Sequence, residues 1–212
     1  MHASCPLCFA APLVHYHEAA GRRYRHCRTC DVVALDRDQL PNRCEERADY
    51  ALHENDPADP RYRRHLAQLT VPLTEGLAAG AVGLDFGCGP GPTISVMLGE
   101  LGFSVRDYDP IFRPDRAALE ERYDFIACTE AAEHFHRPAR AFDLLAGMLR
   151  PAGRLGLMTQ LRTGRIDFPA WRYLRERSHV TFYSPTTMHW IAARYEWTCR
   201  IIGERIVIFA RA

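Results

Sequence analysis

The segment LDFGCGPG at residues 84–91 places an acid just before three glycines at alternate positions. Glycines with this spacing let the backbone turn sharply and lie flush against a ligand, because no side chain intervenes. A dinucleotide fingerprint needs G-x-G-x-x-G, and counting from Gly87 and Gly89 the third glycine position falls on Pro92. Asp85 suits a cationic amino group better than a pyrophosphate.

A second acid follows at a suggestive distance. A ligand that joins an amino-acid end, a sulfonium and an adenosine needs a carboxylate for its ribose hydroxyls, at the end of the next strand. FSVRDYDP supplies Asp109, 18 residues beyond Gly91. Asp107 is the competing choice, but the alternation of the strand and the terminal position favour Asp109.

Cysteine spacing predicts a metal site near the N-terminus. Two C-x2-C turns are formed by Cys5 and Cys8 and by Cys27 and Cys30. Each short turn presents two sulfurs to one tetrahedral ion, so we expect a structural Zn²⁺ in a small ribbon over residues 1–40. The alternative, two disulfides or free thiols, fits poorly with a reducing compartment.

Downstream segments must position these groups. From Val82 short apolar runs alternate with amphipathic helices, which predicts an α/β fold with a mostly parallel, Rossmann-like sheet over residues 80–212. The closely spaced runs at the C-terminus predict an antiparallel hairpin. Residues 41–79 read as a polar linker and a leading helix, although Tyr50 and His53 are larger than a spacer requires.

Four segments together carry a family resemblance: LDFGCGPG, the acid in DYDP, YDFIACTEAAEHF and LRPAGRLGLMT. They resemble the signature segments of class I S-adenosylmethionine-dependent methyltransferases, and the chain is similar to bacterial small-molecule O-methyltransferases of the ubiquinone-pathway type. The cysteine ribbon with HVTFYSP is similar to zinc-binding sugar C-methyltransferases. The resemblance implies S-adenosylmethionine as cofactor, with the methionine end on Asp85, Gly87 and Gly89 and the ribose on Asp109. The further cofactor contacts expected are Cys88, Gly91, Pro110, Ile111, Phe112 and Thr129.

The chain departs from the family pattern after Asp109. Only 13 residues separate Asp109 from Tyr123, enough for one helix and a turn. We therefore predict that the third strand of the family sheet is missing, and that residues 110–112 form the apolar wall for adenine.

Candidate catalytic groups follow the next strand. Glu130, Glu133 and His134 would share one face if that stretch turns helically, and a Glu beside a His is a plausible acid–base pair. The alternative is that Glu130 caps backbone amides and His134 packs as a satisfied histidine.

The segment 171–185 reads as a substrate lid, since it combines aromatic side chains, arginines and a histidine in one long loop. From it we take His179 as a catalytic candidate and Trp171, Tyr173 and Tyr183 as substrate contacts. The alternative is that these aromatics merely anchor a surface loop.

Composition excludes several functions. All 27 basic residues are arginine, so a Walker A loop and a pyridoxal-phosphate aldimine, which need lysine, are ruled out. The net charge of +1 gives no global attraction to nucleic acid, and no apolar run is long enough for a membrane span. We expect a cytoplasmic enzyme whose partner is a small-molecule acceptor, methylated on oxygen or carbon. An RNA methyltransferase or an inert zinc-ribbon binding module are the alternatives, and the oligomeric state is left open.

Overall fold

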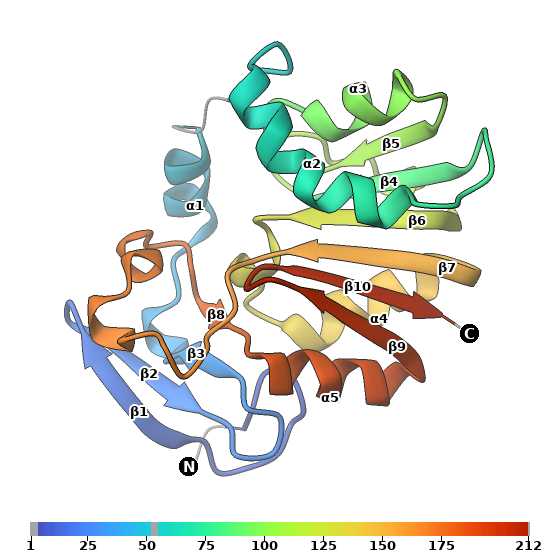
Figure 1. Cartoon of the computed structure of the whole chain (residues 1–212). Coiled ribbons are helices and arrows are strands. Elements are labelled where there is room, and N and C mark those ends of the chain that lie inside the picture. The colour runs from blue at the N-terminus through green and yellow to red at the C-terminus, as the bar shows by residue number, and fades with distance from the viewer. Residues whose placement is uncertain (1–3, 52–54, 212) are drawn as a thin grey trace.

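The computed structural model describes residues 4–51 and 55–211, and its centre is a six-stranded sheet (Figure 1). In spatial order the strands are β5 (Ser104–Tyr108), β4 (Val82–Phe86), β6 (Tyr123–Thr129), β7 (Leu149–Met158), β10 (Ile206–Arg211) and β9 (Trp197–Ile202). The first four run parallel, while β10 and β9 form an antiparallel hairpin at the edge. The predicted mixed sheet with its C-terminal hairpin is confirmed.

Helices cover both faces of this sheet (Figure 1). Their bounds are α2 (Pro60–Thr74), α3 (Thr93–Gly99), α4 (Pro138–Met148) and α5 (Pro185–Tyr195). On one face Leu66, Leu69 and Leu73 of α2 lie one helical turn apart and are buried with residues of α3, β6 and β10. The other face packs against α4 and α5 around Phe142 and Ile191. No described helix is long and apolar enough to cross a bilayer.

A second, four-stranded sheet joins the N-terminal segment to the lid segment. Its antiparallel order is β1 (Val14–Ala19), β2 (Arg22–His26), β3 (Val33–Leu35) and β8 (Thr181–Phe182). Aromatic rings from the 168–182 segment pack on it: Phe168 and Phe182 both lie edge-on to Tyr24. The N-terminal ribbon is therefore completed by a strand from the lid segment, about 150 residues away in the chain.

Asp31 ties this small sheet to α5. Its carboxylate accepts hydrogen bonds from His26 Nε2 at 2.6 Å, from Arg162 Nη2 at 2.8 Å and from the hydroxyl of Ser184, the residue that caps α5. These partners hold the pKa of Asp31 below its ordinary value although burial opposes the shift. Asp31 is thus an ionic link between the cysteine turn and the helical layer.

One stretch differs from the predicted pattern, and another follows it. The predicted linker contains helix α1 (Arg43–Tyr50), which begins with a capping box between Asn42 and Glu45; His53 lies outside the described residues. Residues 112–122 are all described and form no strand, only a 3-10 helix at Arg116–Leu119, so β5 is the sheet edge and the missing third strand is confirmed.

Candidate active site

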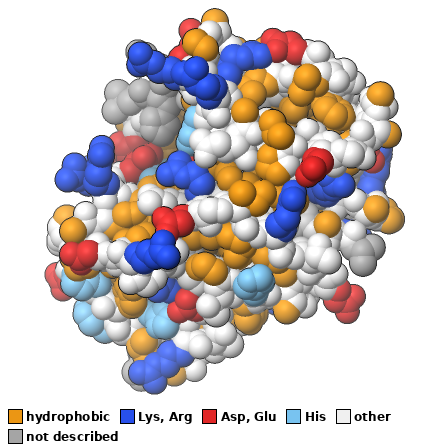
Figure 2. Space-filling model, viewed as in Figure 1, with side chains coloured by type: hydrophobic (Ala, Val, Ile, Leu, Met, Phe, Trp, Pro, Cys, Tyr) orange, Lys and Arg blue, Asp and Glu red, His pale blue; other side chains and the backbone are white. Residues whose placement is uncertain are grey.

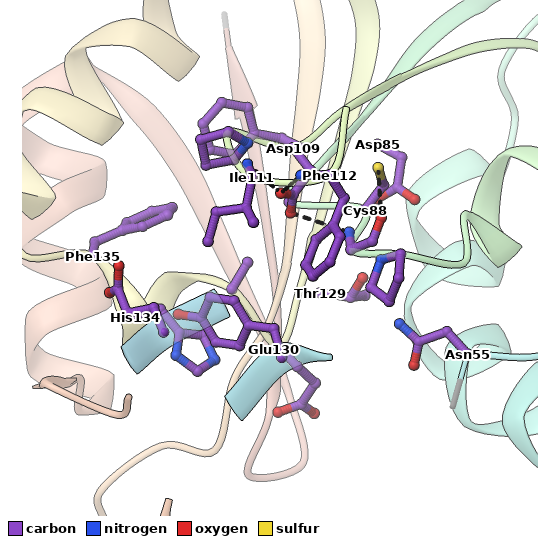
Figure 3. A pocket seen from close by; sticks show the side chains of 18 of the residues that line it. Asn55, Asp85, Cys88, Asp109, Ile111, Phe112, Thr129, Glu130, His134 and Phe135 are labelled. Carbon is purple, nitrogen blue, oxygen red and sulfur yellow. Dashed lines mark hydrogen bonds between the residues drawn. The ribbon is translucent and has the colours of Figure 1, made fainter. Parts of the chain in front are cut away.

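A cavity of about 1080 Å³ opens beyond the carboxyl ends of β4, β5 and β6, between the central sheet, α1, α2 and the lid segment. Figure 3 shows Asp109, Ile111 and Phe112 in its upper part and Glu130 and His134 below them. The volume exceeds that of most drug-sized pockets, so a cofactor and a second small molecule fit together. The sequence-predicted residues that line it are Asp85, Gly87, Cys88, Gly89, Gly91, Asp109, Pro110, Ile111, Phe112, Thr129, Glu130, His134, Tyr173 and His179.

The glycine loop leaves β4 in a conformation that other residues avoid. Gly87 has φ 81° and Gly89 has φ 65°, both in the left-handed region. A Cβ at Gly87 would meet Ala131 Cβ at 2.7 Å, and a Cβ at Gly91 would overlap the backbone of Asn55. The loop therefore needs glycine both to turn and to pass under its neighbours.

Asp85 is a buried acid whose charge is not compensated. Its side chain is 2% exposed, and its Oδ1 has no hydrogen-bond partner among the described residues. Burial, and next the nearby carboxylates of Asp107 and Asp109, raise the pKa of Asp85 well above its ordinary value. An ammonium group bound at the glycine loop would reverse this balance by favouring the carboxylate.

Asp109 fastens the loops after β4 and β5 to each other. Its Oδ1 accepts the backbone N–H of Ile111 at 2.7 Å and of Phe112 at 2.9 Å, and its Oδ2 accepts that of Gly89 at 3.2 Å. The lining of the cavity includes Asp109 and, over the described chain, does not include Asp107. Asp109 therefore reaches the cavity, and its role as the ribose acid stays a prediction.

Three catalytic candidates meet after β6. Glu130 adopts φ 45°, a strained value for a residue with a side chain, and its carboxylate lies 3.5 Å from His65 Nε2. Burial opposes ionisation of Glu130, but hydrogen bonding from His65 brings its pKa below the ordinary value. The side chain of Glu133 is fully buried, and burial followed by the charge of Glu130 raises its pKa. His134 Nδ1 lies 3.0 Å from the carbonyl oxygen of Ser178.

The lid segment brings Tyr173 and His179 to the same place. The Tyr173 hydroxyl hydrogen-bonds Glu133 and also donates to Glu130 Oε2 at 3.4 Å. The centroid of the His179 ring lies 4.1 Å from that of Tyr173, with the two rings tilted, and 4.8 Å from that of His134. His179 Nδ1 is 2.7 Å from the Tyr173 carbonyl oxygen. All four catalytic candidates and Tyr173 thus form one network beside the cavity, in which Glu133 and His179 are buried and Glu130 and His134 are partly exposed.

Two predicted substrate contacts lie elsewhere. Tyr183 is fully buried in the core and donates a hydrogen bond to the carbonyl of Ala132 at 2.9 Å. Trp171 packs into the aromatic cluster of the small sheet, next to Phe168 and Phe182. Over the described chain, neither side chain lines the large cavity. Their role as substrate contacts stays a prediction, and their packing favours the alternative that these aromatic side chains anchor the lid segment.

Residues 41–79 contribute side chains to the cavity wall that the sequence pattern did not identify. Tyr50 of α1 lies edge-on to His134 at 4.9 Å, His65 of α2 pairs with Glu130, and Asn55 covers the glycine loop. The size of Tyr50 was the one signal in the sequence. A polar side chain such as Asn55 carries no local mark of its long-range contact.

The four predicted zinc ligands come together in the ribbon. Their sulfurs lie within 4.8 Å of one another, with Cys5 Sγ 3.6 Å from Cys30 Sγ and Cys8 Sγ 3.4 Å from Cys27 Sγ. These separations exceed the ~2.05 Å of a disulfide and approach the spacing of sulfurs about one tetrahedral Zn²⁺. The backbone N–H groups of Leu7 and Cys8 also point at Cys5 Sγ, both at 3.4 Å, as suits a thiolate. The donor set therefore fits the ion.

Comparisons with known proteins agree with this architecture. A family model described as a methyltransferase domain matches residues 58–200. No curated protein matches the sequence significantly.

Solved structures share the fold at low identity. An O-methyltransferase family protein from Burkholderia thailandensis is 15% identical, with a TM-score of 0.53, over 82% of this chain and 65% of that one, so the chain spans less than two thirds of its length. The 1,6-didemethyltoxoflavin-N1-methyltransferase of the same organism, solved with that compound and S-adenosylhomocysteine, is 16% identical, with a TM-score of 0.57, over 93% and 98%. A protein from Pyrococcus horikoshii OT3 is 16% identical, with a TM-score of 0.55, over 77% and 98%.

Proposed function

The chain belongs to the family defined by this methyltransferase domain, and from that premise we propose that it methylates a small molecule with S-adenosylmethionine as donor. The observation that carries the proposal is the buried Oδ1 of Asp85 beneath a glycine turn, which has no hydrogen-bond partner in the described part of the chain, with Asp109 directly after the adjacent strand. Neighbours named as an O-methyltransferase family protein and as an N1-methyltransferase support a small-molecule acceptor.

The cofactor would lie along the loops that follow β4 and β5. Asp85 would hold the amino group of the methionine end, directly or through water, while Gly87 and Gly89 allow its close approach. Asp109 would accept the ribose hydroxyls, and Ile111 and Phe112 would cover adenine in place of the missing third strand. When bound, the cofactor supplies a methyl group on a sulfonium, ready for in-line displacement.

Glu130 is the group we assign to the acceptor. Its side chain is 38% exposed, lines the cavity and is held as a carboxylate by His65, so it can take the proton of an acceptor hydroxyl. Glu133, Tyr173 and His179 hold Glu130 in its orientation and exclude water behind it. We favour an oxygen or carbon acceptor, and product analysis would separate these from a nitrogen acceptor.

Calorimetric titration with S-adenosylhomocysteine tests the proposal on the full, zinc-loaded chain. We expect one molecule bound per chain. Asp109→Asn should weaken binding about tenfold or more, because it loses a charged acceptor, whereas Asp107→Asn, two residues earlier in β5, should bind like the wild type. Absence of binding by the wild type would refute the proposal.

We also propose that the cysteine cluster holds a structural Zn²⁺ that maintains the ribbon against the lid. The ion would stabilise the Cys27 turn. Asp31 would then connect this turn to α5 and Arg162 through its hydrogen bonds and ion pair. Metal analysis of the purified chain should find one zinc per chain, and Cys27→Ser should lose it. A chain purified without zinc that keeps its full thermal stability would contradict this role.

The two alternative functions gain less support. Figure 2 shows arginines interspersed with acidic and hydrophobic side chains on the visible face rather than gathered in one stripe, and the small sheet packs its aromatic residues against its own lid. RNA binding should then be weak and nonspecific. An inert binding module would not need a carboxylate such as Glu130 facing the cavity.

A further inference from the structure

A second set of metal-ligating side chains borders the cavity. It belongs to the same network of side chains as Glu130. Glu133, His134 and His179 each offer one ligand atom, and these atoms lie within 4.8 Å of one another. Glu176 adds a carboxylate oxygen 3.2 Å from His179 Nε2, which is the separation of adjacent ligands on one ion. Two histidines and a carboxylate are a donor set that binds Mn²⁺, Fe²⁺ or Zn²⁺.

Both histidines are oriented as metal-binding histidines usually are. Nδ1 of His134 lies 3.0 Å from the Ser178 carbonyl, and Nδ1 of His179 lies 2.7 Å from the Tyr173 carbonyl. A carbonyl oxygen only accepts, so each Nδ1 carries the proton and Nε2 becomes the lone-pair nitrogen of the neutral ring. Backbone carbonyls that fix the tautomer in this way are the usual outer partners of metal-bound histidine.

Glu133 supplies the independent sign of a ligand. Its side chain is 0% exposed, its Oε1 is taken by Tyr173, and its Oε2 has no hydrogen-bond partner among the residues that the structure describes. A buried carboxylate oxygen without a partner is costly, and a cation would satisfy it. His179 Nε2 already lies 3.9 Å from the other oxygen of the same group.

We propose that Glu133, His134 and His179, assisted by Glu176, bind one divalent cation at the acceptor side of the cavity. His134, His179 and Glu176 line that cavity, so the remaining coordination positions face it. An acceptor that carries a hydroxyl beside a second oxygen could bind there through both, and the cation would lower the pKa of that hydroxyl. This assignment of an oxygen-chelating acceptor rests on the proposed function; the cation site does not.

Titration with Mn²⁺ of the full chain loaded with a single equivalent of Zn²⁺, which the four thiolates take first, tests the site when followed by the electron paramagnetic resonance of free Mn²⁺. Mn²⁺ is the probe because thiolates bind it poorly, so the cysteine cluster stays out of the measurement. We expect one Mn²⁺ per chain, and at least about tenfold weaker binding in His179→Gln and in Glu133→Gln. Glu133→Gln preserves the shape of the side chain.

His136→Gln is the matched control, because His136 lines the same cavity but pairs with Glu46 outside the cluster. It should bind Mn²⁺ like the wild type. Affinity for S-adenosylhomocysteine, measured on every variant, shows that each one is folded. No Mn²⁺ binding up to about 1 mM by a chain that binds S-adenosylhomocysteine would overturn the cation site and leave the proposed function standing. Mn²⁺ binding by a chain that does not bind S-adenosylhomocysteine would support the cation site and refute the proposed function. Equal Mn²⁺ affinity in wild type, His179→Gln and Glu133→Gln would overturn the site.

Discussion

A deeply buried acid stands beside each half of the cavity, and the two acids are held differently. Asp85, in the cofactor half, has an oxygen with no hydrogen-bond partner among the described residues, and its nearest charged groups are other acids. Glu133, beside the acceptor half, also has such an oxygen, but its other oxygen is joined to Tyr173 and flanked by His179. The cofactor half comes mostly from one run, residues 85–112, with Asn55 and Thr129 added, whereas the acceptor half draws on α1, α2, the loop after β6 and the lid. The first half is a local motif, and the second depends on tertiary assembly.

Removing zinc should give the largest difference between the two halves of the cavity. It should disturb the lid on the acceptor side and leave the cofactor half nearly unchanged. A structural zinc can supply about 10 kcal/mol or more of folding free energy to a small ribbon, and β8 would lose its partner strand β3. Hydrogen exchange should accelerate in β1, β2, β3 and the lid, while affinity for S-adenosylhomocysteine changes by less than about threefold, because β4 keeps its pairing with β5 and β6 without the ribbon. A parallel loss of cofactor affinity would show that the halves are not independent.

Asp85→Asn should break the cofactor half alone. Affinity for S-adenosylhomocysteine should fall about 100-fold, since a charged hydrogen bond inside a buried site is lost. The unliganded chain should become more stable at pH 7. The raised pKa of Asp85 means that its stabilising contribution is full below its unfolded pKa and is lost as the pH rises toward the folded value. Thermal unfolding from pH 4 to 8 checks this, and a less stable variant at pH 7 would contradict it.

Asp31→Asn should weaken the acceptor half through its anchor. We expect the free energy of unfolding to fall by about 2 kcal/mol. This is less than for a fully buried ion pair, because the Asp31 side chain is 28% exposed. The lowered pKa of Asp31 means that this contribution is present above its unfolded pKa and disappears as the pH falls through the folded value. Asp38→Asn, in an exposed pair with Arg23, is the control and should cost less than about 0.5 kcal/mol. Equal losses of unfolding free energy in the two variants, measured in urea, would show that Asp31 does not anchor the acceptor half.

Gly91→Ala should produce the smallest of these changes. The added methyl group would displace Asn55 from the loop, so we expect affinity for S-adenosylhomocysteine to fall about fivefold while the fold is kept. Gly99→Ala, at a helical glycine with open space around it, should leave affinity unchanged and stabilise the chain slightly. Unaltered affinity in Gly91→Ala would mean that Asn55 does not cover the cofactor.

The sequence predicted the parts whose contacts are local. Glycine spacing located the loop, the 13-residue interval excluded a third strand, and the two cysteine turns located the cluster. In each case the physical constraint acts within a few residues of the signal. The division of the chain at residues 40 and 79 stays a prediction, although β8 shows that the ribbon also uses a late strand.

The acceptor half was harder to predict because its contacts are long-range. Pairing of β3 with β8 decides which lid aromatics face the cavity, and no local pattern distinguishes Tyr173, which does, from Tyr183, which is buried. Helix α1 adds Tyr50 beside His134 for the same reason. Residue types indicated the chemistry of this half, but their orientation emerged only from the assembled structure.

Hydrogen exchange of the zinc-loaded chain with and without S-adenosylhomocysteine tests whether the glycine loop binds the cofactor. We expect slower exchange at the glycine loop, residues 87–93, and after β5, residues 109–113, with little change in β1, β2, β3 and β8. Protection confined to the small sheet, or no protection anywhere, would contradict the assignment of the glycine loop as the cofactor site.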